Sequence, residues 1–560
     1  MLKNAPWITL LFFFLFFTTH NTFSQRKSKN GSKATTASEM KVRPKLVVGI
    51  VVDQMRYDYL TRFWDHYGDG GFKRLVNNGF NCKNNHFNYS PTSTGPGHAS
   101  IYTGTTPATH GIIGNNWYEK GSATEVYCAS DNEYTAVGTD SDTGRMSPKR
   151  MLVSTITDEL RLHTQMRGKT IAIALKDRGA VLPGGFTANA AYWFHGMEEG
   201  HWISSTYYMN ELPKWVTDFN ASNAAEQYKK PWTALKALNS YTESGLDNNP
   251  FESLFEGEKS PTFPHDLPTL WGANNQFDII RPTPYGNSLT ADFALAALSG
   301  ENLGQDAITD FLAVSFSSTD YVGHHYGVNS KEIQDTYLRL DQDLERLFKG
   351  LDKKVGDGTY TVFLTADHGA IDVPAYLKSR KLPAGYMEWD ALKERFGTFL
   401  QYTYGTKDIV KNFSNDQFFL DHKIVNNLDL DLGKVQERMA TELLTYEGID
   451  RVYTGVQMRN NNYVKGIPYI LQNGYHQKRS GDVLVVLRPG MVTYGVTGST
   501  HGSPQVYDTH VPLLFYGMGI RSGSTVNRTE IPDIAPTMAT LLGISFPNGT
   551  TGNPISEVLE

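Results

Sequence analysis

The stretch LVVGIVVD (46–53) decides the fold, because a short apolar run rich in valine leads directly into an acidic side chain. Such a run, without polar alternation, is typical of a strand buried on both faces of a parallel sheet. Five further runs have a similar composition, and we expect each to be a strand of the same kind: TIAIAL (170–175), FLAVSFS (311–317), TVFLTA (361–366), DVLVVL (482–487) and PLLFYG (512–517).

Helical patterns lie between several of these expected strands. The clearest spans residues 331–351, where apolar side chains such as Ile333, Tyr337 and Leu340 recur at helical spacing and the other face is charged. Strands that alternate with helices predict an α/β fold, in which a mostly parallel central sheet is flanked by helices on both faces.

Polar side chains come just after four of the expected strands. They are Asp53, Lys176, Asp320 and Asp367. In open parallel sheets, ligands bind beyond the carboxyl ends of the strands. This shared placement therefore predicts one common site at that edge of the sheet.

The N-terminus indicates export. Lys3 precedes a short apolar run that has about half the length a bilayer-spanning helix needs. We expect a signal peptide at residues 1–24 and a flexible leader at 25–44. No stable membrane span is expected after cleavage, so the protein is predicted to be periplasmic or secreted.

Residues 45–560 are expected to form one catalytic domain with insertions at about 186–290 and 376–480, where the strand and helix patterns weaken. The net charge of −6 provides no field that attracts polyanions, so no nucleic acid polymer is expected as a partner. Cys82 and Cys128 leave two possibilities open, one disulfide or two buried thiols.

Three aspartates, three histidines and one hydroxyl form a candidate metal-binding set, which suits two divalent cations around a phosphate. Two of them form D-x-x-x-H, which a helical turn would place on one face. An Asp-His pair follows a strand directly, and another histidine lies in a glycine-rich loop. The set is Asp53, Thr94, Asp320, His324, Asp367, His368 and His501.

The hydroxyl of this set lies in SPTSTGPGHAS (90–100), just before an expected helix. At that position the positive end of the helix dipole favours an alkoxide or a bound phosphate. Spacing alone favours no single hydroxyl, so Thr92 and Ser93 remain rivals of Thr94.

Two cations follow the strand at 170–175. If the backbone is extended there, Lys176 and Arg178 point to one place and Asp177 points away. A like-charged pair on one face is unfavourable unless an anion lies between its members. The alternative is an exposed, solvated edge.

In this order, the motifs resemble those of the alkaline phosphatase superfamily. They are an aspartate at a first strand end, T-x-P at a helix start, D-x-x-x-H, D-H-G and a late H-G. The segment DIAPTMATLLGI (533–544) is similar to the family's closing helix, and the resemblance covers most of residues 45–550. The K-D-R element (176–178) resembles the bacterial phosphate-irrepressible, PafA-type enzymes. The nucleotide pyrophosphatase/phosphodiesterase branch shares the threonine and the ligand set.

The resemblance implies two Zn²⁺ per chain. Asp53, Asp367 and His368 resemble the ligands of one zinc, which also contacts the nucleophile Thr94. Asp320, His324 and His501 resemble the ligands of the other zinc. That zinc activates the leaving group and then the attacking water.

The resemblance also implies the groups that bind substrate. Asn115, with Asn116 as the alternative, resembles an asparagine that binds a phosphoryl oxygen. Lys176 and Arg178 resemble cations that contact the phosphoryl oxygens, and they favour a monoester dianion over a diester.

The implied function is that of an alkaline phosphatase, which hydrolyses small-molecule phosphate monoesters through a covalent phosphothreonine. The alternatives are a phosphodiesterase or nucleotide pyrophosphatase of the same superfamily, and an inactive binding protein on this scaffold. An arylsulfatase is disfavoured, because Thr94 and His98 stand where the C/S-x-P-x-R motif needs Cys or Ser and Arg. No third, Mg²⁺ site is evident.

Overall fold

The computed structural model describes residues 43–560. The expected signal peptide and nearly all of the expected leader, residues 1–42, lie outside this range. Among the described residues, no helix has the length and apolar character needed to cross a membrane.

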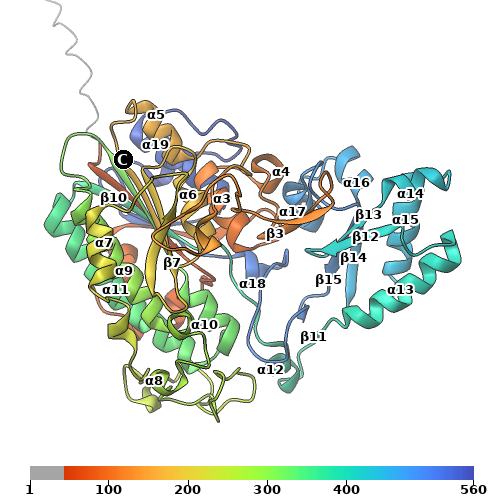
Figure 1. Ribbon diagram of the computed structural model, residues 1–560, viewed down its shortest axis with the longest axis horizontal. Coiled ribbons are helices and arrows are strands. Elements are labelled where there is room, and N and C mark those ends of the chain that lie inside the picture. Colours follow the sequence, from red (N-terminus) through yellow and green to blue (C-terminus); the bar gives the residue numbers. More distant parts are fainter. Residues whose placement is uncertain (1–42) are drawn as a thin grey trace, which may run out of the picture. The chain divides into compact units, whose positions relative to one another are not determined.

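A ten-stranded sheet forms the centre of the fold (Figure 1). Its five middle strands are parallel, in the order β10–β1–β9–β6–β7. The α/β fold with a mostly parallel central sheet is therefore confirmed. These middle strands are β1 (Leu46–Val52), β6 (Thr170–Ala174), β7 (Ala190–His195), β9 (Asp310–Phe316) and β10 (Tyr360–Thr365).

The remaining strands extend the sheet on both sides. Beyond β10 the order is β17–β2–β18, and beyond β7 it is β8–β5. β17 runs antiparallel to β10, and β8 runs antiparallel to β7. The bounds are β2 (Phe80–His86), β5 (Ala136–Val137), β8 (His201–Ser205), β17 (Leu513–Gly517) and β18 (Gly523–Glu530).

We expected all six apolar runs to be strands of one parallel sheet, and two of them are not. The run at 512–517 forms β17, which is antiparallel. The run at 482–487 forms β15 (Val483–Leu487), which belongs to a separate four-stranded sheet. Both expectations were wrong because an apolar run indicates burial, whereas strand direction and partner depend on pairing with distant segments.

Helices cover both faces of the central sheet (Figure 1). One group contains α3 (Thr94–Thr103), α5 (Ile156–His163), α6 (Asp177–Gly184) and α19 (Ile534–Leu542), which contact one another. The other group contains α7 (Lys214–Ala221), α9 (Pro284–Gly300), α10 (Ser318–Tyr326) and α11 (Lys331–Leu351).

Helix α11 has the bounds that the apolar pattern predicts. It begins where Ser330 Oγ accepts a hydrogen bond from the backbone N–H of Ile333 (3.1 Å), which caps the first turn. Its charged face is not simply solvated, because Asp335 is buried and accepts hydrogen bonds from Trp232 Nε1 (2.8 Å) and the hydroxyl of Tyr241 (2.6 Å).

The segment 186–290 is only partly separate from the central sheet. It begins with β7 and β8, which are strands of that sheet. The expectation of an insertion beginning at 186 was therefore wrong for this part. The reason is compositional, because AAYWFH and HWISS bury aromatic and polar side chains instead of a continuous aliphatic run.

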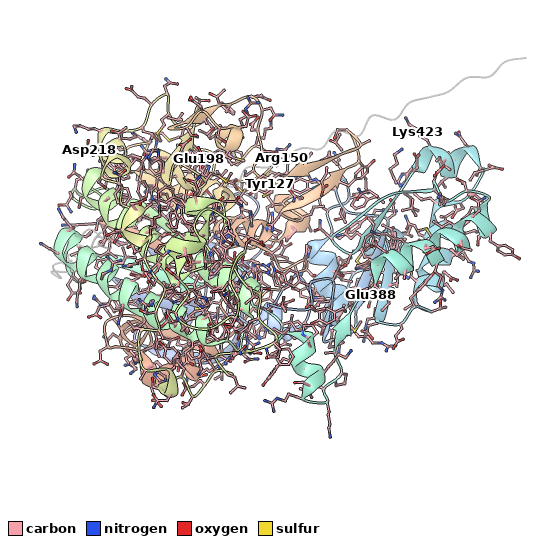
Figure 2. The ribbon with its side chains drawn as sticks, turned by 60° about the horizontal axis from the view of Figure 1, so that its bottom comes forward. Tyr127, Arg150, Glu198, Asp218, Glu388 and Lys423 are labelled. Carbon is pink, nitrogen blue, oxygen red and sulfur yellow. The ribbon has the colours of Figure 1, made fainter. Side chains whose placement is uncertain are left out.

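Residues after 376 contribute a second sheet with its own hydrophobic core. Its strands, all antiparallel, follow the order β12–β13–β15–β14. Glu388 and Lys423, labelled in Figure 2, mark helices beside it. The other bounds are β12 (Val410–Ser414), β13 (Gln417–Leu420), β14 (Ile449–Thr454), α13 (Trp389–Tyr404), α14 (His422–Asn427) and α15 (Leu432–Leu443).

Cys82 and Cys128 are both buried and free. Burial raises the pKa of each thiol to about 12. Of the two possibilities, the structure therefore favours buried thiols, which remain protonated and unreactive at neutral pH.

Packing of α11 against α9 predicts a measurable stability difference. Leu344 is fully buried, so Leu344→Ala should lower the free energy of unfolding by about 2–5 kcal/mol through lost contacts and a cavity. Lys349→Ala, on the exposed side of the same helix, should cost no more than about 0.5 kcal/mol. Urea denaturation of both variants measures the difference, and equal effects would contradict this packing.

Candidate active site

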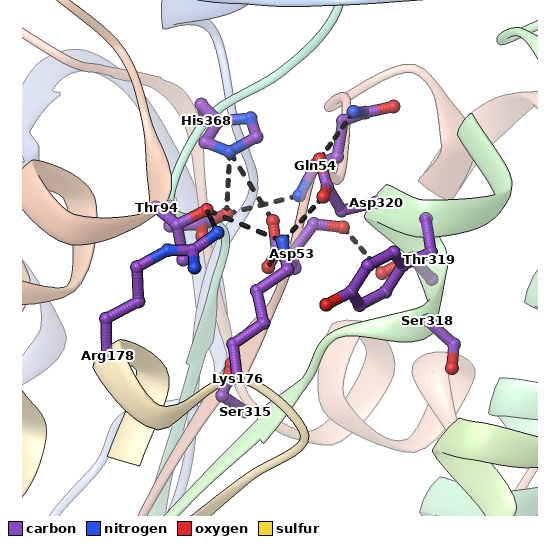
Figure 3. Close-up of polar contacts among 12 residues, drawn as sticks. Asp53, Gln54, Thr94, Lys176, Arg178, Ser315, Ser318, Thr319, Asp320 and His368 are labelled. Atoms are coloured by element: carbon purple, nitrogen blue, oxygen red, sulfur yellow. Dashed lines mark hydrogen bonds and ion pairs between the residues drawn. The ribbon is translucent and has the colours of Figure 1, made fainter. Parts of the chain in front are cut away.

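Four neighbouring strands of the central sheet are each followed by a polar residue, and Figure 3 shows three of these residues together, Asp53, Lys176 and Asp320. Asp53 follows β1, Lys176 comes after β6, Asp320 after β9 and Asp367 after β10. Because these strands are parallel and adjacent, their carboxyl ends meet at one edge of the sheet. Asp53, Lys176 and Asp320 contact one another at this edge, and His368 links Asp53 to Asp367.

Lys176 lies between two of the carboxylates. Its Nζ is 2.7 Å from Asp53 Oδ2 and 2.5 Å from Asp320 Oδ2, and all three side chains are buried. Tyr321 covers the ammonium group, whose nitrogen lies 4.9 Å from the ring centroid. The alternative of an exposed, solvated edge therefore does not hold for Lys176, which is buried.

Thr94 is the first residue of α3, so its hydroxyl lies at the positive end of a ten-residue helix. It is 1% exposed. Two cations approach its Oγ1 at 3.5 Å each, Nζ of Lys176 and Nη2 of Arg178. This hydroxyl therefore lies where an anion would be stabilised by two positive charges and a helix terminus.

The two rival hydroxyls are placed differently. Thr92 is fully buried, and its Oγ1 donates to the carbonyl oxygen of Ser503 (3.0 Å). Ser93 precedes the helix, and its buried Oγ finds no hydrogen-bond partner among the described residues. Neither contacts the two cations, so the geometry favours Thr94.

Lys176 and Arg178 converge for a reason other than the expected one. The segment is not extended, because Arg178 already belongs to the first turn of α6 and only Lys176 has an extended backbone. Asp177 nevertheless turns away, as expected, and accepts hydrogen bonds from the Tyr127 hydroxyl and the Arg178 backbone N–H. Tyr127 also accepts a hydrogen bond from Arg178 Nη1 (3.1 Å), which fixes the guanidinium.

Asp320 lies between two imidazoles. Its Oδ1 is 3.1 Å from His324 Nε2 and 3.6 Å from His501 Nε2. Asp320 and His324 share one face because the segment forms helix α10, as the D-x-x-x-H spacing predicts. The ligand atoms of these three residues lie within 4.8 Å of one another.

A second group adjoins the first. Asp53, Asp320 and His368 also bring their ligand atoms within 4.8 Å of one another. His368 Nε2 lies 3.4 Å from Asp53 Oδ1 and 3.7 Å from Asp367 Oδ1. Asp367 thus borders this group through its contact with His368.

The three site histidines share one feature of their rings. Each Nδ1 lies at hydrogen-bond distance from a backbone carbonyl, which can only accept, so the neutral ring carries its proton on Nδ1 and presents Nε2 as a free ligand. Burial lowers the pKa of both His368 and His501, which keeps these two rings neutral. The acceptors are Ser499 for His324 (2.8 Å), Gly369 for His368 (3.0 Å) and Thr92 for His501 (2.7 Å).

The buried carboxylates repel one another. Burial raises the pKa of Asp53 well above its usual range, and the charges of Asp320 and Asp367 raise it further. Burial also acts to raise the pKa of Asp320, but His324 and Lys176 outweigh it and hold the pKa well below the usual range. Further positive charge is therefore favourable beside Asp53.

Within residues 43–560, three buried ligand atoms find no hydrogen-bond partner, namely Asp53 Oδ1, Asp367 Oδ2 and His368 Nε2. Buried polar atoms without partners are costly, so they indicate a missing partner. A metal ion accepts electron pairs from both carboxylate and imidazole ligands. The residues present therefore fit a metal site.

Asn115 lies beside the start of α3. Its Oδ1 accepts a hydrogen bond from the backbone N–H of Gly95 (2.7 Å), the residue after Thr94. Asn116 is more exposed and begins the strand β3 (Asn116–Glu119). Of the two candidates, Asn115 is the one whose side chain reaches the site.

A cavity of ≈ 360 Å³ opens beside these residues. Ser93, Asn115 and His501 line it on the side of the central sheet, and Asp416 and Val485 line it on the side of the small sheet. The two sides are joined at the turn between β12 and β13, where Asn415 Nδ2 donates to the carbonyl oxygen of Asn116 (2.8 Å).

Sequence reasoning missed two residues that contact the expected ligands. His98 Nδ1 lies 3.3 Å from Asp367 Oδ2, and its Nε2 is 2.9 Å from Ser315 Oγ. Gln54 contacts both Asp367 and Asp320. The only available signal was adjacency, since Gln54 follows Asp53 and His98 lies one turn after Thr94.

The model of the type I phosphodiesterase / nucleotide pyrophosphatase family matches residues 47–510. A protein of Myroides odoratus, named calcium-transporting ATPase, is 45% identical over 538 residues, or 94% of this chain and 97% of that one. Alkaline phosphatase PhoV of Synechococcus elongatus is 45% identical over 526 residues, or 92% and 93%.

Alkaline phosphatase PafA of Elizabethkingia meningoseptica is 44% identical over 521 residues, or 92% of this chain and 95% of that one. A crystal structure of PafA has a TM-score of 0.89, with coverage of 92% of this chain and 99% of the crystallised chain. The chain therefore belongs to the type I phosphodiesterase / nucleotide pyrophosphatase family. The resemblance to the alkaline phosphatase superfamily, and to PafA-type enzymes in particular, is confirmed.

Neighbouring histidines provide a test of metal binding. His324 faces Asp320, whereas His325 stacks on Phe255 (ring centroids 5.0 Å apart). His324→Ala should therefore lower the content of tightly bound divalent metal, measured by elemental analysis of the purified protein. The matched variant His325→Ala should retain it. An equal metal content in both variants and in the wild type would argue against the site.

Proposed function

We propose that the protein is a zinc-dependent phosphatase that hydrolyses phosphate monoesters through a covalent phosphothreonine. The observation that carries this proposal is the position of the Thr94 hydroxyl, between two cations and beside buried ligand atoms that lack partners. The alkaline phosphatases PafA and PhoV, at 44–45% identity over nearly the whole chain, support it.

Zinc is proposed as the metal because three carboxylates and three imidazoles form a mixed donor set, which suits Zn²⁺ better than Mg²⁺ or Ca²⁺. When bound, zinc lowers the pKa of an oxygen nucleophile and stabilises charge on phosphoryl oxygens. One ion would be held by Asp53, Asp367 and His368, beside Thr94. The other would be held by Asp320, His324 and His501.

Thr94 is the proposed nucleophile. Its Oγ1 attacks phosphorus and forms a new P–O bond, while the bond from phosphorus to the leaving oxygen breaks. The leaving oxygen takes up a proton in place of the one that the Thr94 hydroxyl loses. Water then hydrolyses the phosphothreonine and restores the hydroxyl. The N-terminus of α3 stabilises the negative charge that develops on the hydroxyl oxygen before attack.

Three side chains are proposed to bind the phosphoryl oxygens, Lys176, Arg178 and Asn115. The Asn115 amide is oriented because its Oδ1 accepts from Gly95 N–H, which leaves its Nδ2 group available to donate. Two cations beside the transferring group stabilise a monoester dianion more than a diester, which carries one negative charge fewer. This difference favours monoesters as substrates.

A phosphodiesterase or nucleotide pyrophosphatase is the second candidate, favoured by the family that matches residues 47–510. An inactive binding protein is disfavoured, because all seven candidate ligands lie at the same edge of the sheet. The proposed location is the periplasm or the exterior, on the basis of the signal-like N-terminus. The proposed substrates are small molecules.

Thr94→Ala should lower kcat/KM for an aryl phosphate monoester by at least about 10³-fold, because it removes the hydroxyl that lies beside both cations. Thr94→Ser should fold normally and retain part of the activity. Ser93→Ala is the matched control, with steady-state kinetics as the measurement. Near wild-type turnover of Thr94→Ala together with inactive Ser93→Ala would move the nucleophile to Ser93.

Substitution of both cations tests the preference for monoesters. Lys176→Ala combined with Arg178→Ala should lower kcat/KM for an aryl phosphate monoester by about 10²-fold or more, and should affect its methyl diester far less. Lys214→Ala, on an exposed side chain of α7, is the control and should leave both rates unchanged. Equal losses on both substrates would favour the diesterase candidate.

A further inference from the structure

Gln54 lies between the two ligand groups and has no part in the proposed chemistry (Figure 3). It directly follows Asp53 and is 3% exposed. A long polar side chain is rarely buried to this extent unless its amide is bound, so its partners indicate its purpose.

The two donors of Gln54 are directed to two different carboxylates. Its backbone N–H donates to Asp367 Oδ1 (3.1 Å), and its side-chain Nε2 donates to Asp320 Oδ1 (2.6 Å). Asp320 is common to both ligand groups, whereas Asp367 borders the group of Asp53 and His368. Gln54 thus holds the carboxylate that the two groups share and a second one that borders the site.

The backbone of Gln54 is unusual for its residue type. Its φ of +63° lies in the left-handed region. It is the third residue of a β-turn that Met55 N–H closes on the carbonyl oxygen of Val52 (3.2 Å). Glycine or asparagine is preferred at this turn position, so the backbone conformation does not explain why the residue is glutamine.

Helix α10 leaves room for the same amide. A Cβ atom at Gly323 would lie 1.9 Å from Gln54 Oε1, so only glycine permits this contact. Gly323 immediately precedes His324 and lies inside a helix, where glycine is unfavourable. The hydrogen bond from Gln54 to Asp320 thus depends on two residues that are unfavourable in their local backbone, Gln54 in the turn and Gly323 in the helix.

We propose that Gln54 is a positioning residue, which orients Asp320 for metal binding through its side-chain amide. The amide occupies one lone pair of Asp320 Oδ1 and leaves another directed toward Nε2 of His324 and His501. Hydrogen bonds of this kind hold a ligand in the orientation that binding needs. The inference rests on the proposed metal site, and the test separates the two.

Gln54→Asn is the decisive variant. Asparagine suits the left-handed turn and keeps an amide, but its side chain is shorter by one methylene and no longer reaches Asp320. Gly323→Ala provides a second route, because the added methyl group displaces the amide while favouring the helix. Gln165→Asn is the matched control, since Gln165 is exposed and also has a positive φ of 53°.

Zinc affinity is measured by competition with a chromophoric chelator, and the stability of the metal-free proteins by thermal unfolding. We expect one of two zinc sites to weaken by about 10-fold or more in Gln54→Asn and in Gly323→Ala, without any loss of thermal stability. The control Gln165→Asn should retain wild-type affinity at both sites.

The possible failures are distinguishable. A wild-type chain that binds fewer than two zinc ions would contradict the proposed metal site, whatever Gln54 does. Two intact sites of wild-type affinity in Gln54→Asn would overturn the role of the amide alone. A loss of affinity that comes with an equally clear loss of thermal stability would overturn it too, because Gln54 would then act on the fold.

Discussion

The burial of three carboxylates at one edge of a sheet is the constraint on which the rest of the structure depends. Asp53, Asp320 and Asp367 are at most 3% exposed, and the charges of Asp320 and Asp367 both act on Asp53. A parallel sheet produces this arrangement, because its strands end at the same edge. The compensating charge comes from elements added beyond that edge, such as the Lys176 ammonium group and the N-terminus of α3.

The same constraint fixes residues that carry no chemistry. A Cβ atom at Gly97 of α3 would lie 2.3 Å from the carbonyl oxygen of Asp367. The close approach of helix and strand end thus depends on a residue without a side chain. The hydroxyl of Thr94, one turn earlier on the same helix, is placed by that approach. The close packing of α3 on the end of β10 therefore also determines where the Thr94 hydroxyl lies.

Much of the site could be predicted from the sequence, because several expected ligands follow an apolar run or lie at helical spacing. Asp53 at the end of β1 and the Asp320–His324 pair are examples. The sheet to which β15 belongs and the direction of β17 could not be predicted, since both depend on pairing with distant segments. Nor could the role of Gln54, because its two hydrogen bonds need a left-handed backbone that no local pattern signals.

The β12–β13 turn connects two hydrophobic cores that share no residue. Asn415 and Asp416 form this turn with positive φ values of 50° and 55°, and it contacts the chain next to Asn115. One wall of the cavity therefore belongs to the core that supports the ligands, and the opposite wall to an independent core. Substitutions in the second wall can therefore accumulate without disturbing the core that supports the candidate ligands, so the shape of the cavity and the geometry of the ligands can vary independently.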